Sequence, residues 1–293
     1  MLDDVHALVE FAEAGSIARA ADRLYRTPSA VTRQIQRLEA LLGAELLDRS
    51  AKPPRMTPLG ARVLEQARDL LARADALKAI ASPTTEPSGL LRVGIAHALA
   101  EGALAGPIGA LQERFPKVRL RVISELTPDL FKRLLRAEID IAAVLLPEGH
   151  PAPAPLVTNV ISTDRMVIVQ PSNYRLEPSW ANLSTKSWVL NPPGCMLRAR
   201  LLDAMENAGA ATIIGAEIHN MHLQLSLVAS GYGLGLLPER FVRREGSRMN
   251  VSTVEPEAFD LRMAIAVVRS GPLGSLEQSA VDFEQSLSEL FAT

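Results

Sequence analysis

The chain has 293 residues, of which 47% are hydrophobic and 22% charged, a composition of globular proteins that excludes a disordered or fibrous chain. This length exceeds what one ordinary domain core needs, so a small domain and a larger one are expected. The net charge is −2, but residues 16–62 hold nine basic and four acidic side chains, a local excess that can attract a polyanion.

Cysteine usage and the first residues bear on the compartment. The single cysteine, Cys195, cannot form a disulfide within the chain and leaves no thiol pair for a structural metal, which suits a reducing cytoplasm. Asp3 and Asp4 stand where a secretory signal would carry positive charge and an apolar run. The longest uncharged stretch, 219–238, is interrupted by polar residues. We therefore expect a cytoplasmic protein with no membrane role.

The N-terminal segment predicts three helices. Apolar residues from Val5 to Ala12 recur at helical spacing, and Gly15 is suited to end that helix. Ser16 can cap a second helix that stops near Tyr25. Thr27 and Pro28 supply a cap and a first-turn proline for a third. A short helix, a tight turn and a longer helix form the helix-turn-helix pattern, whose second member lies in the DNA major groove.

The third helix has two faces of opposite character. Val31, Ile35, Leu38 and Leu42 form an apolar stripe, which places the polar side chains outward. The candidate DNA-binding residues of this helix are Thr27, Ser29, Ala30, Thr32, Arg33, Gln36 and Arg37. Arginine and glutamine can read base edges or pair with phosphates, and the helix start offers free amides to a phosphate. The alternative is a polar face that only meets solvent.

A basic, proline-rich loop follows between Glu45 and Thr57. Arg49, Lys52 and Arg55 lie in it, and prolines limit its freedom in the unfolded chain. These cations can follow the DNA backbone or minor groove beside the recognition helix, as a wing does. A plain surface hairpin is the alternative.

These segments together resemble the signature of LysR-type transcription regulators. The matching stretches are Phe11–Ser16, Ala20–Leu24, Pro28–Ile35, Arg37–Glu39, Gly43, Leu46–Arg49 and Thr57–Gly60. Two positions depart from the family: Pro28 stands where glutamine is frequent, which bears on base preference, and Leu47 where phenylalanine is usual, which is a core exchange. The resemblance implies a winged helix-turn-helix DNA-binding domain over residues 1–60.

A long helix is predicted next, opened by Thr57 and Pro58. Its apolar positions follow a heptad-like pattern: Val63, Ala67, Leu70, Ala74, Leu77 and Ala81, widened by Leu64 and Leu71. From Pro58 to Ser82 it would span roughly 35 to 40 Å, which favours a second copy as partner. Packing on its own domain is the alternative. In the family this helix pairs two subunits, so residues 58–89 are interpreted as a dimerisation helix with a hinge at Pro83, Pro87 and Ser88–Gly89, in a dimer or a dimer of dimers.

From Leu90 onward strands alternate with helices, which predicts a parallel α/β sheet in two lobes. Strands are expected at Leu91–Ala96, Val118–Ser124, Ile139–Leu146, near Arg165–Gln170, at Ser187–Leu190, near Ile213–Ile218 and at Leu261–Arg269. Helices are expected at Ala103–Phe115, Pro128–Ala137, Met196–Ala208, Met221–Ser230 and Leu276–Phe291. The pattern resembles the periplasmic-binding-protein-like effector domain of LysR regulators, here residues 90–293, with lobe I at about 90–161 and 267–293 and lobe II at about 162–266.

Ligands of open α/β sheets bind beyond the carboxyl ends of the strands, which nominates a cleft between the lobes. The candidate effector-binding residues are His97, Ala98, Leu99, Thr127, Asn191, Gly194, Cys195, Arg198, His219 and Asn220. Amides near Cys195 and the charge of Arg198 would suit an anionic effector. Family members commonly have serine or threonine just after the first strand, where this chain has Ala96, His97 and Ala98, so the effector's identity stays open.

Three other patterns are interpreted without a cofactor. His97, His219 and His222 lack acidic partners at fixed spacing, so no metal site is assigned. Cys195 could sense oxidants, but the chain has no second cysteine to resolve it, and a buried or merely pocket-lining cysteine is favoured. The glycines at 231, 233 and 235 follow a helix and lead into a strand, the reverse of a dinucleotide loop.

The leading functional prediction is a ligand-responsive transcription regulator that binds double-stranded DNA and a small molecule. RNA polymerase is a further partner if the chain is an activator. The alternative is an enzyme or solute carrier of the same two-lobed fold with an appended helical domain. The chain has no Gly-x-Ser-x-Gly elbow and no phosphate loop, which argues against an enzyme. Neither alternative accounts for the first eighty or so residues.

Overall fold

The computed structural model describes residues 1–81, 86–100 and 104–292. The chain divides into two compact units: Met1–Gly89 with the short segments Leu135–Glu138 and Pro272–Gln278, and Leu90–Leu134 with Ile139–Gly271 and Ser279–Thr293. The predicted hinge residue Pro83 lies outside the described residues, as do Ser82 and Ala103 at the ends of two predicted helices.

The first unit begins with the three predicted helices, α1 (Leu2–Ala14), α2 (Ile17–Arg23) and α3 (Pro28–Leu42). Their caps are those expected: Ser16 Oγ accepts from the amide of Arg19, and Thr27 Oγ1 from the amide of Ala30, both at 3.2 Å. Gly15 and Gly43 end α1 and α3 in the left-handed conformation. The second helix ends at Arg23, slightly before the predicted end near Tyr25.

The core of this unit confirms the apolar stripe of α3 with one exception. Val31, Ile35 and Leu38 are buried together with Leu8 of α1. Leu42, predicted to face inward, is 47% exposed instead. It is the last residue before Gly43 turns the chain away, so the final turn of α3 extends past the core.

The basic loop forms a short hairpin, with β1 (Leu47–Asp48) antiparallel to β2 (Arg55–Met56). The helix α4 (Pro58–Ala81) then begins, capped by Thr57 Oγ1, which accepts from the amide of Gly60 at 2.9 Å. A side chain at Gly60 would lie 2.1 Å from the carbonyl oxygen of Leu46, so glycine permits this close approach.

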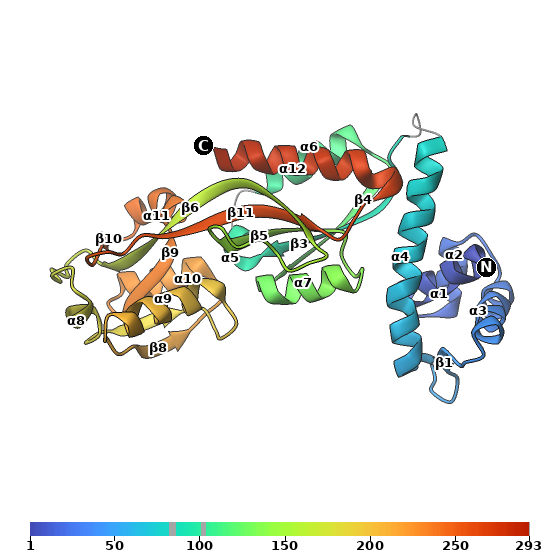
Figure 1. Cartoon of the computed structure of the whole chain (residues 1–293), viewed down its shortest axis with the longest axis horizontal. Helices are drawn as coiled ribbons and strands as arrows, with labels where there is room; N and C mark the ends of the chain where they lie inside the picture. The colour runs from blue at the N-terminus through green and yellow to red at the C-terminus, as the bar shows by residue number, and fades with distance from the viewer. Residues whose placement is uncertain (82–85, 101–103, 293) are drawn as a thin grey trace. The chain divides into compact units, whose positions relative to one another are not determined.

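The apolar residues of α4 lie on two faces of the helix. In Figure 1, α1, α2 and α3 lie along one side of α4, where Ala67 is buried and Val63, Leu64 and Leu71 pack against the helical core. Leu70 and Leu77 are 39% and 69% exposed. The stripe therefore packs partly on its own domain, one of the two predicted arrangements, and leaves other apolar side chains uncovered.

The second unit is built on a nine-stranded sheet among the described residues, in the order β4-β3-β5-β11-β6-β9-β7-β8, with β10 on β6. The strands are β3 (Gly89–Ala96), β4 (Val118–Glu125), β5 (Ile141–Pro147), β6 (Val157–Pro171), β7 (Ser187–Leu190), β8 (Ile213–Glu217), β9 (Leu234–Pro238), β10 (Val251–Val254) and β11 (Leu261–Arg269). The helices are α5 (His97–Ala100), α6 (Ala105–Arg114), α7 (Thr127–Leu135), α8 (Trp180–Leu183), α9 (Met196–Asn207), α10 (Met221–Ala229), α11 (Glu239–Glu245) and α12 (Glu277–Ala292), with single 3₁₀ turns at Gly246–Arg248 and Gly274–Leu276.

The prediction of a parallel sheet is correct only for some neighbouring strands, and the sheet as a whole is mixed. The pair β3 and β5 is parallel, and so are β7 with β8 and β7 with β9. The long strand β6 pairs antiparallel with β11 over Val157–Met166 and with β9 over Met166–Val169. Because β6 carries the chain out of one lobe and β11 carries it back, the two must run in opposite directions and the sheet is mixed (Figure 1).

Helices cover both faces of the sheet in the first lobe. In Figure 1, α6 and α12 lie on one side of β3 and β5, and α7 lies on the other. Arg114 of α6 pairs with Asp282 of α12 at 2.6 Å. The short elements α8, α11 and β10 are absent from the sequence prediction. None of the helices in the described ranges is long and apolar enough to cross a bilayer.

Candidate functional site

The outer face of α3 presents most of the residues predicted to contact DNA. Thr27, Ser29, Arg33, Gln36 and Arg37 are exposed. The remaining two, Ala30 and Thr32, are half-buried, and the Thr32 hydroxyl donates to the carbonyl oxygen of Pro28 at 2.9 Å within the helix. The helical period thus gathers one polar face opposite the core.

Two arginines of this face differ in their partners. Arg37 donates through Nη2 to Oδ1 of Asp4 in α1 at 2.6 Å, which ties the two helices together. Burial would raise the pKa of Asp4, but hydrogen bonds from Arg37 and the N-terminal amine outweigh it and lower that pKa. Arg33 forms no ion pair with any residue in the described ranges, so its guanidinium is available to an external anion.

The hairpin is anchored to α3 through Glu39. The Glu39 carboxylate accepts from the amides of Leu46 and Leu47 at 2.8 and 3.1 Å and pairs with Arg49 at 2.6 Å. Burial favours the neutral acid, yet the hydrogen bonds from Arg49 and the two amides dominate and lower the Glu39 pKa. Arg49 therefore has an internal partner, whereas Lys52 and Arg55 extend into solvent.

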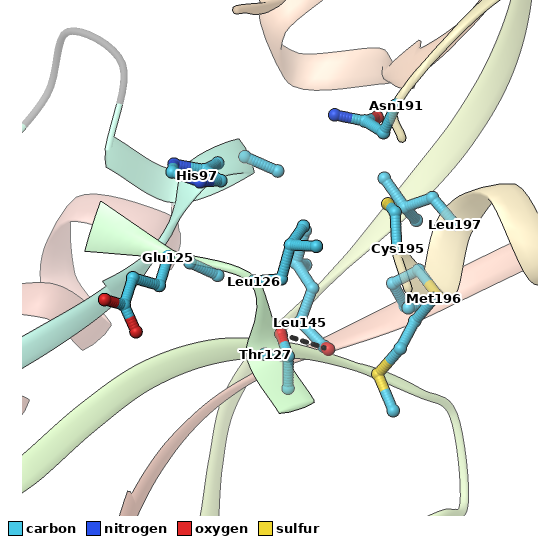
Figure 2. A pocket seen from close by; sticks show the side chains of 12 residues that line it. His97, Glu125, Leu126, Thr127, Leu145, Asn191, Cys195, Met196 and Leu197 are labelled. Carbon is cyan, nitrogen blue, oxygen red and sulfur yellow. Dashed lines mark hydrogen bonds between the residues drawn. The ribbon is translucent and has the colours of Figure 1, made fainter. Parts of the chain in front are cut away.

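The second unit contains a small cleft between its lobes, with a volume of about 30 Å³. Its lining residues are Ala96, His97, Ala98, Glu125, Leu126, Thr127, Leu145, Asn191, Cys195, Met196, Leu197 and Met263. Figure 2 shows His97, Leu126 and Thr127 on one side, with Asn191, Cys195 and Met196 facing them. The structure thus brings together five of the predicted residues: His97, Ala98, Thr127, Asn191 and Cys195.

The other predicted residues do not line this cleft, and Arg198 and Asn220 have partners elsewhere in lobe II. Arg198 pairs with Glu217 at 2.5 Å and donates to the carbonyl oxygen of Asn191, so its charge is compensated inside lobe II. Asn220 is the cap of α10, its Oδ1 accepting from the amide of Leu223 at 2.8 Å. Leu99 and Gly194 are likewise absent from the lining.

His219 contacts His97 instead of the cleft. Their ring centroids are 4.8 Å apart, and His97 Nδ1 lies 2.9 Å from the Ser124 hydroxyl. His97 follows β3 of lobe I and His219 follows β8 of lobe II, so the ring contact joins the two lobes beside the cleft. Among the described residues, no group of three or more histidine, cysteine or acidic side chains could hold a metal ion.

Hydrogen bonding and ionisation differ among the cleft residues. Thr127 and Asn191 are 6% and 9% exposed, and Thr127 Oγ1 donates to the carbonyl oxygen of Leu145 at 3.4 Å. Glu125 receives two hydrogen bonds from Arg133, at 2.7 and 2.6 Å, and Figure 2 shows its carboxylate pointing away from Asn191. Burial raises the pKa of Cys195 against hydrogen bonds from the amides at the start of α9, which favours the neutral thiol.

Sequence reasoning missed the apolar half of the cleft. Leu145 lies in β5, Met263 lies in β11, and Met196 and Leu197 start α9. The sequence does not distinguish Leu145 and Met263 from their neighbours, because each lies in a strand that is mostly apolar and buried. The strand order, which places β5 beside β11, is the information that identifies them.

Two family descriptions match this chain. Residues 2–61 match the bacterial regulatory helix-turn-helix protein of the lysR family, and residues 84–278 match the LysR substrate binding domain. Because the second match covers more than half of the chain, the protein belongs to the LysR family of transcription regulators, which bind DNA and a small-molecule effector. The resemblance predicted from the sequence is confirmed.

Individual relatives and solved structures agree with this family. The chain is 25% identical over 299 aligned positions to the transcriptional dual regulator GltC of Bacillus subtilis, covering 99% of this chain and 97% of GltC. Full-length OxyR of Pseudomonas aeruginosa has a TM-score of 0.78 at 19% identity, with 98% and 97% of the chains covered. Full-length CbnR, solved with its target DNA, has a TM-score of 0.57 at 19% identity, with 98% and 99% covered. These two structures share the fold.

Proposed function

We propose that α3 enters the DNA major groove and that Arg33 is its principal contact. The observation that carries this is the difference between Arg33, which has no internal ion pair in the described part of the chain, and Arg37, which is paired with Asp4. Gln36 lies on the same exposed face beside Arg33, where both can reach base edges. CbnR, which shares the fold, forms a complex with its target DNA, and this supports the proposal.

The hairpin serves as the wing in this proposal. Lys52 and Arg55 are exposed near its tip and approach the DNA backbone or minor groove. Arg49 holds the hairpin against Glu39 and reaches a phosphate only with its remaining donors. Thr27 and Ser29 present hydroxyls at the start of α3, where backbone amides favour a phosphate.

We infer that three parts of the chain have separate roles. Residues 1–60 read DNA, residues 58–89 pair with a second copy, and residues 90–293 bind the effector. Leu70 and Leu77 support the pairing, since both are apolar side chains of α4 that the single chain leaves exposed. The protein then acts in the cytoplasm as a homodimer or a dimer of dimers, by binding rather than by catalysis, and contacts RNA polymerase if it activates transcription.

The effector site proposed here is the cleft between the lobes. A volume of about 30 Å³ holds little more than one water molecule, so effector binding requires the lobes to move apart. The ring contact between His97 and His219 opposes that movement, so the effector has to favour a different lobe arrangement. An anionic group would meet the amides at the start of α9 and His97, because Arg198 is already paired.

DNA binding by an Arg33→Ala variant tests the proposal. DNA fragments are first selected from a genomic pool with the wild-type protein, and affinities are then measured by fluorescence anisotropy at fixed salt. We expect Arg33→Ala to weaken binding about tenfold or more. Arg262→Ala, which removes an exposed arginine of β11, is the matched control and should bind as the wild type does. Equal affinity of Arg33→Ala and wild type would refute the contact.

A further inference from the structure

A second cavity lies beside the effector cleft in the second unit. It has a volume of about 260 Å³, against about 30 Å³ for the cleft, and offers room for on the order of ten non-hydrogen atoms. Ala98 and Leu145 border both spaces and form the wall between them. We call this cavity the Arg240 pocket; its principal lining residues are Leu99, Asp164, Met221, Arg240, Phe241 and Phe291.

The Arg240 guanidinium is poorly satisfied by the surrounding protein. Its Nε lies 3.8 Å from Oδ2 of Asp164, beyond hydrogen-bond distance, and its Nη2 reaches the carbonyl oxygen of Thr163 only at 3.5 Å. Its Nη1 is buried without a hydrogen-bond partner among the described residues. The guanidinium carbon lies 5.3 Å from the ring centroid of Phe291. A hydrogen-bond acceptor on a ligand would pair with these guanidinium N–H groups, which have few acceptors in the surrounding protein.

The one carboxylate in the pocket lining, Asp164, forms a long ion pair with Arg240 and also has other partners. Burial raises the pKa of Asp164, while the charge of Arg240 and the backbone amides of Arg240 and Arg165 act in the opposite direction. The Asp164 carboxylate thus accepts from these amides and compensates part of the Arg240 charge, while Nη1 of Arg240 is left without an acceptor among the described residues. A second arginine, Arg244, also lines the pocket, with its Nε 2.8 Å from Glu245. Cationic groups thus outnumber anionic ones in the lining.

The remaining walls are apolar and come from both lobes. Leu290 and Phe291 belong to α12 of lobe I, whereas Met221 and Phe241 belong to α10 and α11 of lobe II. A pocket with apolar walls and one convergent charged group selects a ligand with an apolar body and an opposite charge. Because its walls come from both lobes, a ligand there stabilises one arrangement of the lobes.

We propose that the Arg240 pocket binds a small organic carboxylate with an apolar body of about six to nine carbon atoms, at a site separate from the effector cleft. The carboxylate accepts from the Arg240 guanidinium, and the apolar body packs against Phe241, Leu290 and Phe291. This site lies beyond the effector cleft of the proposed function and does not depend on which molecule occupies that cleft.

Calorimetric titration of the full chain without DNA tests the pocket. The probes are phenylacetate and hexanoate, each compared with its neutral amide, phenylacetamide and hexanamide. Arg240→Gln keeps hydrogen-bond donors but removes the charge, and Leu290→Trp fills the apolar end without touching Arg240. The matched control is Arg243→Gln, on the same helix, where the side chain is 77% exposed and pairs with Glu239. Melting temperatures verify that each variant is folded.

We expect saturable binding of at least one carboxylate and binding at least about tenfold weaker for its amide. Arg240→Gln should weaken carboxylate binding by a similar factor, Leu290→Trp should abolish it, and Arg243→Gln should leave it unchanged. The proposal is overturned if neither carboxylate binds saturably, or if binding survives in both pocket variants. Since no DNA is present, failure here leaves the proposed DNA contact of Arg33 standing, and failure of that contact leaves the pocket standing.

Discussion

The outer face of α3 and the cleft of the second unit both present polar side chains, but they do so under different constraints. On α3, five of the seven nominated residues are exposed because one helical period decides which side they occupy. In the cleft, Arg198 and Asn220 were nominated because they follow the carboxyl ends of strands, yet Arg198 pairs with Glu217 and Asn220 caps a helix. Sequence periodicity thus predicts which face a residue occupies, whereas a cleft also depends on partners from distant segments.

Glu39→Ala should produce the largest effect, because it removes a buried group that three donors share. The amides of Leu46 and Leu47 lose their acceptor and Arg49 loses its ion pair. We expect the free energy of unfolding of the first unit to fall by about 3 kcal/mol. Chemical denaturation followed by circular dichroism of the full chain measures this. A loss below about 1 kcal/mol would show that the hairpin is held by its apolar contacts instead.

Arg37→Ala tests whether Arg37 and Arg33 of α3 have different roles, one in stability and the other in DNA binding. Loss of its ion pair with Asp4 should lower stability by about 1 kcal/mol, a modest value because the arginine side chain is 62% exposed. The same denaturation experiment on Arg33→Ala should show no change, since that residue has no ion pair among the described residues. Equal destabilisation by the two variants would contradict the assignment of separate roles.

The pH dependence of the Arg37→Ala effect has a definite sign. The folded-state pKa of Asp4 is lowered, so the stabilisation is present above the unfolded-state pKa of the carboxyl group and is lost as pH falls through the lowered folded-state pKa. The difference in melting temperature between wild type and Arg37→Ala should therefore shrink on acidification below about pH 4. A difference that grows toward acid would exclude the Asp4 pair as its source.

His219→Ala should give the smallest effect and probes the cleft rather than α3. Removing one ring of the His97–His219 contact costs about 0.5–1 kcal/mol and loosens the link between the lobes. Hydrogen exchange of the amides at His97–Ala100 should become faster. His222→Ala is the matched control, because its ring packs on Phe241 within one lobe at 4.9 Å. Unchanged exchange in His219→Ala would mean that other contacts hold the lobes together.

Helix caps, turns and apolar periods were all readable in the sequence because they depend on neighbouring residues. Ser16 and Thr27 cap the helices for which they were nominated, and Gly15 and Gly43 end helices. The strands Ser187–Leu190 and Leu261–Arg269 have the predicted bounds. The family motif of the first sixty or so residues likewise depends on local spacing.

Only the tertiary structure decided the mixed sheet, the exposure of Leu42 and the pairing of Arg198 with Glu217. It also decided that Arg240 of α11 and Phe291 of α12 face one cavity. These features join segments far apart in the chain, and their energies depend on burial and on partners that local spacing does not specify. The amino-acid sequence by itself determined the helices, the strands and the family, because those follow from local periodicity and motifs. The tertiary structure determines which charged side chains have an ion-pair partner, because the partners lie on segments that only folding brings together.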